Sequence, residues 1–461
     1  MSLKTNVLLL GLPDVAPPLG RVAKIPSLGL ASIAANLDRD ITNVHIADLS
    51  LVDAPMPAYI GFLLDTCKPD LVGISSMTFQ YPTAEKVARL INKYDGSILL
   101  GLGGYHASLA PETVDHRLFD FLFRGEAEAS ARGLVRAIHE GISFDEIAGI
   151  SYSDRRGFHH NQREGLLNLD ELKFPDRDAR LITGFNILGI PSDTVETSRG
   201  CSNGCEGCSI SGMYGRSFRT YSLDRVMADI EDAKSRGARL IIFIDDNITL
   251  DMNRFRDLCD KIIDTGNNDI RYAIQAEVPR IASDPDIGRR MREAGIVMGF
   301  LGIENVIQRN RADFGKARTS TEQVESAVHY LKSAGVITWG GFVVGYPDDT
   351  REDLWANYRY GKKLRLDRST FSILTPFPGT PLRRRLLAQG LVTNPDDLSR
   401  YTTNRANIRT KHLSSGELET TIRLMYLRQN INPSYLLGNN LLKYPELIRF
   451  APGFARESFR F

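Results

Sequence analysis

The sequence lacks the features that mark several common classes of protein. Its 461 residues hold 57 Lys and Arg against 56 Asp and Glu, so no broad basic surface for nucleic acid is expected. The longest apolar run near the start, residues 7–12, ends at Pro13 and Asp14. Such a run is too short for a membrane span or a signal peptide. We therefore expect a cytoplasmic protein with no membrane span.

Cysteine is scarce, and its placement is uneven. Three of the five cysteines, Cys201, Cys205 and Cys208, fall within eight residues. A disulfide framework spreads an even number of cysteines along a short secreted chain, so this clustering indicates a metal site instead. Cys67 and Cys259 lie in apolar helical patterns, which predict buried thiols.

The chain is too long for one ordinary core, and its 42% hydrophobic and 25% charged residues are typical of a globular protein. Residues 1–145 alternate apolar strands with amphipathic helices, which predicts a doubly wound parallel sheet covered on both faces. The strands are expected at 6–10, 44–47, 71–75, 98–102 and 118–123.

Such sheets bind ligands at the carboxyl ends of their strands. Small or polar residues follow several of these strands, and they are the candidate ligand contacts of this domain: Ser75, Ser76, Gly103, Gly104, Gly125 and Glu126. The glycines are equally typical of ordinary tight turns.

Residues 146–190 interrupt the alternation and are expected to form a linker. Strands at 147–153 and 158–161 flank Asp154 to Gly157 and predict a hairpin. His159 and His160 are adjacent on a strand and point to opposite faces, so exposed histidines are expected there and not a metal site.

Strand–helix alternation returns over residues 191–390. Six strands are expected, at 194–198, 240–244, 272–276, 297–303, 337–344 and 370–374. They predict an incomplete (β/α) barrel, with the functional residues at the carboxyl ends of its strands. Ser320 and Gln323 form a capping box that begins a helix, and Gly335 ends it. Residues 391–461 predict a mainly helical region with a helix at 417–428. Residues 435–461 are expected to close the open side of the barrel or to meet a partner.

Thiolates suit iron–sulfur clusters or zinc. A structural zinc site takes four ligands, and no other cysteine is near in sequence. Three thiolates on one loop hold three corners of a cubane and leave one iron open for chemistry, so we favour a [4Fe–4S] cluster. Gly200 and Gly204 supply the backbone freedom that such a loop needs.

Residues 194–390 resemble the radical S-adenosylmethionine (SAM) superfamily, whose signature is this cysteine spacing after the first barrel strand. The resemblance implies that Cys201, Cys205 and Cys208 are the catalytic cluster ligands and that the open iron chelates SAM. An electron from the cluster would then split a carbon–sulfur bond, and the 5′-deoxyadenosyl radical would abstract hydrogen from the substrate. The residue before the last cysteine is usually aromatic in the family, and here it is Gly207.

The resemblance implies further cofactor-binding residues. Asp245 and Asp246 stand where relatives meet the SAM amino group, although capping of the strand end explains them equally well. Glu304 corresponds to the family motif near the ribose, and Gly341 and Gly345 to the glycine motif beside the adenine. On the third strand, relatives often carry a basic residue where this chain has Glu277.

The sixth-strand segment, residues 375–382, is similar to that of the cobalamin-binding group of this superfamily. Residues 26–30, 72–76, 102–106 and 124–126 resemble the cobalamin-binding domain of the same group. The resemblance implies a cobalamin held between this domain and the barrel. The Asp-x-His-x-x-Gly pattern that supplies an axial histidine in other cobalamin proteins is absent, and some members with this domain bind no cobalamin.

Three functions stay open at this point. The first is cobalamin-dependent methylation of an unactivated carbon in a small-molecule substrate. The second is a radical oxidoreductase, cyclase or dehydratase that tailors aminoglycosides or other natural products. The third is a non-catalytic binding protein. Either enzyme needs an electron donor such as flavodoxin or ferredoxin. A second cluster would need several cysteines in the front domain, which has one.

Overall fold

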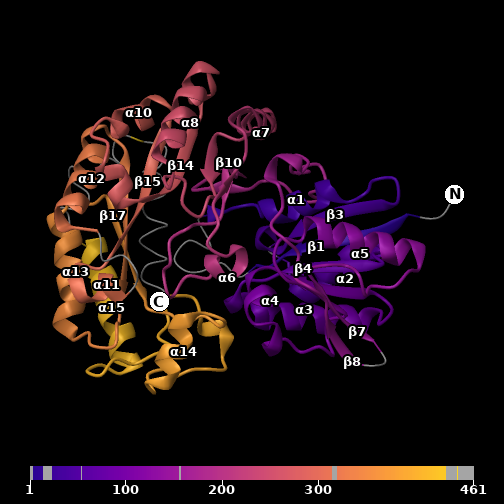
Figure 1. Cartoon of the computed structure of the whole chain (residues 1–461). Helices are drawn as coiled ribbons and strands as arrows, with labels where there is room; N and C mark the ends of the chain where they lie inside the picture. The colour runs from indigo at the N-terminus through magenta and orange to yellow at the C-terminus, as the bar shows by residue number, and fades with distance from the viewer. Residues whose placement is uncertain are drawn as a thin grey trace. The chain divides into compact units, whose positions relative to one another are not determined.

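The computed structural model describes residues 4–13, 23–52, 54–154, 157–313, 319–431 and residue 444. The chain forms two compact units (Figure 1). The front unit takes its residues from 1–15, 26–184 and 212–215, and the barrel unit takes them from 16–25, 185–211 and 216–461.

The front unit is built on a seven-stranded sheet in the order β3-β1-β4-β5-β6-β7-β8. Its first five strands are parallel, as predicted: β1 Thr5–Gly11, β3 Thr42–Asp48, β4 Leu71–Ser75, β5 Leu99–Gly103 and β6 Phe121–Phe123. Successive residues of β1 are buried on both faces, because Leu8 and Leu10 are as enclosed as Val7 and Leu9. Helices therefore cover both faces of the sheet.

The helices of the front unit pack in pairs, α1 against α5 and α2 against α3. Their bounds are α1 Leu28–Asn36, α2 Met56–Cys67, α3 Tyr81–Tyr94, α4 Tyr105–Leu109 and α5 Glu128–Glu140. Helix α1 begins after Ser27, whose hydroxyl oxygen accepts a hydrogen bond from the Leu30 amide at 3.5 Å.

The predicted hairpin is present, with β7 Ile150–Asp154 antiparallel to β8 Gly157–His160. It belongs to the front sheet, because β7 also pairs antiparallel with β6. The sequence placed these residues in a linker, and the structure instead extends the front unit to residue 184. Antiparallel pairing of a hairpin with a distant parallel strand leaves no local signal, so the expected boundary at residue 145 falls inside the sheet.

The barrel unit carries the predicted six parallel strands, in the order β17-β16-β15-β14-β13-β10. Their bounds are β10 Ile190–Val195, β13 Leu240–Phe243, β14 Arg271–Glu277, β15 Ile296–Glu304, β16 Ile337–Val344 and β17 Arg368–Ile373. Two short antiparallel strands, β9 Asn186–Ile187 and β2 Ala23–Lys24, extend the edge beside β10. A separate ribbon joins β11 Ser198–Arg199 to β12 Arg219–Thr220.

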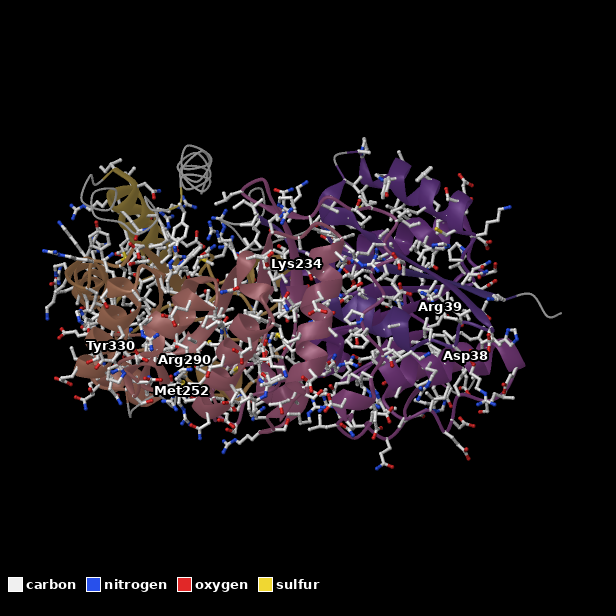
Figure 2. All side chains as sticks on the ribbon, turned by 90° about the horizontal axis from the view of Figure 1, so that it is seen from above. Asp38, Arg39, Lys234, Met252, Arg290 and Tyr330 are labelled. Atoms are coloured by element: carbon white, nitrogen blue, oxygen red, sulfur yellow. The ribbon has the colours of Figure 1, made fainter. Side chains whose placement is uncertain are left out.

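Helices such as α12 Thr321–Ser333 and α13 Arg351–Lys363 lie outside the curved sheet of the barrel unit (Figure 1). The other helices of this unit are α7 Leu223–Ser235, α8 Met252–Asp264, α9 Val278–Ala282, α10 Ile287–Glu293, α11 Gln308–Asp313, α14 Pro381–Ala388 and α15 Ser415–Ile431. The short α6 Ile210–Tyr214 follows the cysteines, and its residues 212–214 belong to the front unit. Charged side chains on two of these helices form ion pairs: Lys234 of α7, labelled in Figure 2, pairs with Asp269, and Arg290 of α10, also labelled there, pairs with Asp260.

The capping box is confirmed. The Ser320 hydroxyl accepts from the Gln323 amide at 3.2 Å, and the Gln323 side chain accepts from the Ser320 amide at 2.9 Å. Gly335 follows the helix with φ of 83°. The predicted helix at 417–428 is the centre of α15.

Most of the segment at 435–461, expected to close the barrel or meet a partner, lies outside the described residues. The described Tyr444 is buried against Val297 and Ile337, and its hydroxyl donates to the Gly335 carbonyl at 3.1 Å. Among the helices of the described ranges, none has both the length and the apolar character needed to cross a membrane.

Candidate active site

The three clustered cysteines line one cavity of about 180 Å³ in the barrel unit. We call it the barrel cavity. Three further wall residues come from the cysteine loop and the start of the helix after it: Asn203, Ile210 and Ser211. The rest come from the carboxyl-terminal parts of β13, β14 and β15 and the residues that follow them: Asp246, Asn247, Gln275, Ala276, Glu277, Phe300, Gly302 and Glu304. Side chains from separate strands thus converge with the cysteine loop where parallel barrels carry their active sites.

The entry of the cysteine loop requires a glycine. Gly200 has φ of 86°, and a Cβ at this position would stand 2.5 Å from the Ser217 carbonyl oxygen. The loop then turns back on itself, because the Cys208 amide donates to the Cys205 carbonyl at 3.2 Å. The backbone freedom predicted for Gly200 is therefore used.

The donor set fits a cluster with one vacant iron. The three cluster cysteines are half-buried, whereas Cys67 and Cys259 are buried in α2 and α8, as predicted for core thiols. Three thiols on one loop that line a cavity can supply three ligands of a cubane and leave its fourth iron facing the cavity.

The two adjacent carboxylates after β13 have different partners. Asp245 is buried and accepts hydrogen bonds from the Thr197 amide at 3.1 Å, the Thr197 hydroxyl at 2.6 Å and the Ser198 hydroxyl at 2.5 Å. It is not among the residues that line the barrel cavity. Of the two interpretations of Asp245, these contacts favour the one in which it caps the strand end. With Thr197 and Ser198 held in this way, β10 ends at Val195, before the predicted strand end at residue 198.

Asp246 is the carboxylate that lines the cavity. Its Oδ2 accepts from the Gly200 amide at 2.9 Å. Burial raises the pKa of Asp246 to about 6, and the neighbouring Asp245 contributes to the rise. Asp246 therefore joins the start of the cysteine loop to the cavity wall.

Carboxylates dominate the polar wall of the cavity. Asp246, Glu277 and Glu304 come from the ends of three successive strands. Glu304 has φ of 68°, a left-handed conformation that non-glycine residues rarely adopt. This arrangement suits a ligand that carries positive charge, as the sulfonium and ammonium groups of SAM do.

The two glycines predicted to contact SAM, Gly341 in β16 and Gly345 just after it, do not line the cavity. A Cβ on Gly341 would stand 2.5 Å from the Phe300 ring, and Phe300 lines the cavity. Gly345, with φ of 86°, donates its amide to Asp349 at 2.9 Å and shapes the turn after β16. Neither glycine is part of the cavity wall, so Gly341 contributes by making room for Phe300.

Sequence reasoning missed several wall residues. Asn203, Gln275 and Phe300 received no role, and Glu277 was noted as a departure from relatives only. Gln275 and Glu277 stand at the end of the predicted third strand, so the rule that strand ends carry function could have found them. Phe300 lies inside a strand and gave no such signal.

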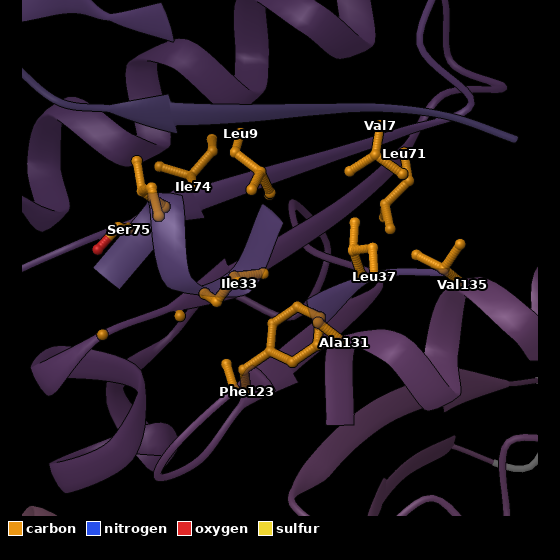
Figure 3. Close-up of a pocket in the computed structure, with 15 residues that line it drawn as sticks. Val7, Leu9, Ile33, Leu37, Leu71, Ile74, Ser75, Phe123, Ala131 and Val135 are labelled. Atoms are coloured by element: carbon orange, nitrogen blue, oxygen red, sulfur yellow. The ribbon is translucent and has the colours of Figure 1, made fainter. Parts of the chain in front are cut away.

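The front unit has its own small cavity of about 60 Å³ (Figure 3). Val7, Leu9 and Phe123 give it an apolar wall (Figure 3), and Ser75, Gly103 and Gly104 also line it. Ser76 is buried beside them, and its amide donates to the Gly103 carbonyl at 3.0 Å.

Gly104, which lines this cavity, and Gly125, which follows β6, differ in their surroundings. A Cβ on Gly104, whose φ is 92°, would stand 2.7 Å from the Ser76 carbonyl oxygen. Gly125 has φ of 104°, and no described atom lies within 4 Å of where its Cβ would be. The backbone at Gly125 is therefore open to a ligand at the carboxyl ends of the front strands. Glu126 is buried and accepts from the Leu167 amide at 3.0 Å, so its carboxylate holds a loop of the protein.

The paired histidines have protein partners. His159 Nε2 lies 2.7 Å from Asp154, and His160 Nδ1 lies 2.8 Å from the Ser151 hydroxyl. His160 is exposed, as expected, whereas His159 is half-buried.

Comparison with known proteins agrees with this site. Residues 195–360 match the Radical SAM superfamily, and residues 21–135 match the B12 binding domain. The chain is 30% identical to the uncharacterized methyltransferase PH0819 of Pyrococcus horikoshii, over 94% of this chain and 95% of the relative. It is 27% identical to the anaerobic magnesium-protoporphyrin IX monomethyl ester cyclase of Cereibacter sphaeroides, over 88% of this chain and 66% of the relative.

A solved structure shares the fold. The cobalamin-dependent S-adenosylmethionine radical enzyme OxsB, with aqua-cobalamin and S-adenosylmethionine bound, superposes with a TM-score of 0.72. The match covers 99% of this chain and 72% of OxsB at 17% identity. The order of a B12-binding sheet followed by a partial barrel is therefore common to both proteins.

Proposed function

The chain belongs to the radical SAM superfamily, in the group that carries a B12-binding domain before the barrel, and from this premise we propose that it is a cobalamin-dependent radical methyltransferase. The radical SAM domain of the chain implies a [4Fe–4S] cluster and SAM, and its B12-binding domain implies cobalamin. The observation that carries the proposal is the convergence of Cys201, Cys205 and Cys208 with three carboxylates on one cavity.

The cluster ligands are Cys201, Cys205 and Cys208. Their loop is fixed to the barrel at its start, where the Gly200 amide donates to Asp246. Asp245 holds Thr197 and Ser198 just before it, so the position of the loop follows from the end of β13. When bound, the cluster and SAM supply a 5′-deoxyadenosyl radical, and methylcobalamin supplies a methyl group.

We assign Asp246 to the amino group of SAM and Glu304 to the side of its ribose, as the resemblance to the family implies. Both line the cavity with the cysteines, and a carboxylate beside an ammonium forms a charge-assisted hydrogen bond. Phe300 offers an apolar surface on the same wall, and Gly341 gives its ring the space it occupies. Gly345 and Asp245 support these elements without facing the ligand.

Cobalamin binds at the carboxyl ends of the front strands in this proposal. The residues that would contact it there are Ser75, Ser76, Gly103, Gly104 and Gly125. Ser75, Gly103 and Gly104 line the front cavity, Ser76 supports it through Gly103, and Gly125 leaves its backbone open. Glu126 has a supporting role, because its carboxylate is engaged by the Leu167 amide.

The substrate is a small molecule, and the reaction needs a reductant. We propose flavodoxin or ferredoxin as the one-electron donor. Methylation is favoured by PH0819, a methyltransferase aligned over nearly the full length of both chains. A cyclase reaction is the second candidate, because the cyclase of Cereibacter sphaeroides is also a relative.

Product analysis separates the two candidates. Reconstituted protein is incubated anaerobically with SAM, methylcobalamin, a reductant and pooled candidate substrates, and the nucleoside products are measured by mass spectrometry. Methyl transfer yields S-adenosylhomocysteine together with 5′-deoxyadenosine, whereas other radical chemistry yields 5′-deoxyadenosine alone. Cys205→Ala should abolish both products. Cys259→Ala, at a buried thiol away from the cavity, is the matched control and should retain them.

A further inference from the structure

An asparagine links the cysteine loop to the floor of the barrel cavity. Nδ2 of Asn247 lies 3.9 Å from Cys201 Sγ and donates to Glu277 Oε2 at 3.0 Å. N–H···S contacts are long because sulfur is a large atom. Asn247 is almost wholly buried, so water does not compete for its amide.

A threonine fixes which end of this amide faces the sulfur. The Thr249 hydroxyl donates to Asn247 Oδ1 at 3.1 Å and accepts from the Glu277 amide at 2.9 Å. Because Oδ1 is occupied as an acceptor, the NH₂ group must face Glu277 and Cys201. Thr249 has no exposed surface, so its hydroxyl holds the Asn247 amide in this orientation from the buried side.

The partner carboxylate is held on both oxygens. Glu277 Oε2 takes the Asn247 amide, and Oε1 accepts from Asn203 Nδ2 at 3.3 Å. Asn203 belongs to the cysteine loop, so Glu277 connects the loop to the segment after β13. Glu277 therefore orients the amides of Asn247 and Asn203 by accepting from both. As a carboxylate it cannot itself donate a hydrogen bond to sulfur.

We propose that Asn247 is a positioning residue that donates a hydrogen bond to the thiolate of Cys201 and raises the reduction potential of the cluster. This inference rests on the proposed function, in which Cys201 is a cluster ligand. A ligating thiolate has no proton, so the amide is the donor. Hydrogen bonds to the sulfurs are among the factors that set iron–sulfur potentials.

The direction of the effect follows from charge. Reduction adds one electron, supplied by an external reductant, and increases the negative charge on the cluster and its thiolates. A fixed N–H donor stabilises the reduced form more than the oxidised form, so its loss lowers the potential. Thr249 and Glu277 act through Asn247, because they hold the amide in the donating orientation.

The experiment is an EPR-monitored redox titration of the full chain after anaerobic reconstitution, without substrate. Asn247→Ala should lower the ratio of reduced to oxidised cluster at a fixed potential by about threefold to tenfold, which corresponds to about 30–60 mV for a one-electron couple. Cys259→Ala is the control. Its thiol is buried in α8 and does not line the barrel cavity, so the potential should stay at the wild-type value.

Thr249→Val covers the case in which Asn247→Ala loads no cluster. It keeps the Asn247 amide but removes the Thr249 hydroxyl that orients it, so the potential should also fall, by a smaller amount. An unchanged potential in a loaded Asn247→Ala protein, or in Thr249→Val when only that variant loads, overturns the inference. The iron and sulfide content of the wild type separates failure of this inference from failure of the proposed function. A wild type that takes up no cluster refutes both. A loaded wild type whose variants show no shift in potential refutes this inference alone.

Discussion

Arg385 of α14 forms a forked ion pair with Glu206, which stands between the second and third cluster cysteines. Its Nη2 lies 2.6 Å from Glu206 Oε2, and its Nε lies 3.1 Å from Oε1. The Glu206 carbonyl also accepts from the Leu382 amide at 3.2 Å. The outer side of the cysteine loop is therefore tied to a helix that lies 179 positions away in sequence.

Arg385→Ala should loosen the cluster without unfolding the barrel. Both partners of the ion pair are about 29% exposed, so the loss to global stability is expected to stay near or below about 1 kcal/mol. The loop loses its outer anchor, and iron should dissociate faster from the reconstituted protein in the presence of a chelator. Arg289→Ala, which breaks an exposed ion-pair group on α10, should leave the rate of iron loss at the wild-type value. Equal rates in the two variants would contradict the anchoring role.

Cys259 should affect stability and not the cluster. It is wholly buried in α8, and burial raises the pKa of its thiol to about 12, so it remains protonated. Cys259→Ser places a hydroxyl in an apolar site and should cost about 1–3 kcal/mol of unfolding free energy. Urea unfolding measures this loss, and iron content measures the cluster. A fall in iron per folded protein would assign Cys259 a role that its position does not support.

The sequence predicted the frame of both units because their strands are continuous apolar runs. β4 Leu71–Ser75 and β16 Ile337–Val344 have the expected bounds. The place of β7 and β8 in the front sheet was not predictable, because their pairing with β6 depends on tertiary contact. β6 is also shorter than expected, three residues in place of six.

The site was predicted in part, and there is a physical reason why the rest was not. The cysteine spacing is local and can be recognised in the sequence, and the ends of the predicted strands indicated Asp246 and Glu304. Asp245 and Asp246 are neighbours in sequence, and only the fold shows that one supports Thr197 while the other faces the cavity. The contact between Asn247 and Cys201 spans 46 positions and leaves no pattern in the sequence.

His106 should make the front unit sensitive to acid. It is fully buried beside Tyr81, and burial lowers the pKa of its ring to about 4. The unfolded ring takes up a proton near pH 6.5, so the stabilising contribution of neutral His106 is complete above pH 6.5. It is lost as the pH falls from 6.5 towards 4, by up to about 3 kcal/mol.

His106→Phe tests this dependence, because phenylalanine keeps a ring beside Tyr81 and cannot take up a proton. Between pH 7 and pH 5 the wild type should lose about 2 kcal/mol more unfolding free energy than the variant. Urea unfolding at the two pH values gives the comparison. Parallel losses in both proteins would show that His106 is not the titrating group.

Gly104→Ala and Gly125→Ala should have different effects although both glycines have positive φ. The added methyl of Gly104→Ala meets the Ser76 backbone, so this variant should be the less stable by at least about 1–2 kcal/mol. Gly125→Ala has free space and pays only for its backbone conformation. Because that space lies at the proposed cobalamin site, Gly125→Ala should still fold yet bind cobalamin more weakly. Visible absorption after gel filtration measures retained cobalamin, and wild-type retention would argue against this site.

The most direct test of the account is whether SAM binds the cluster held by Cys201, Cys205 and Cys208. The EPR spectrum of the reduced, reconstituted protein is recorded before and after addition of SAM. The vacant iron corner predicts that SAM changes the g values of the signal in the wild type, and that Cys205→Ala gives no such signal. A fully loaded wild-type cluster with an identical spectrum in the presence and absence of SAM would contradict the account.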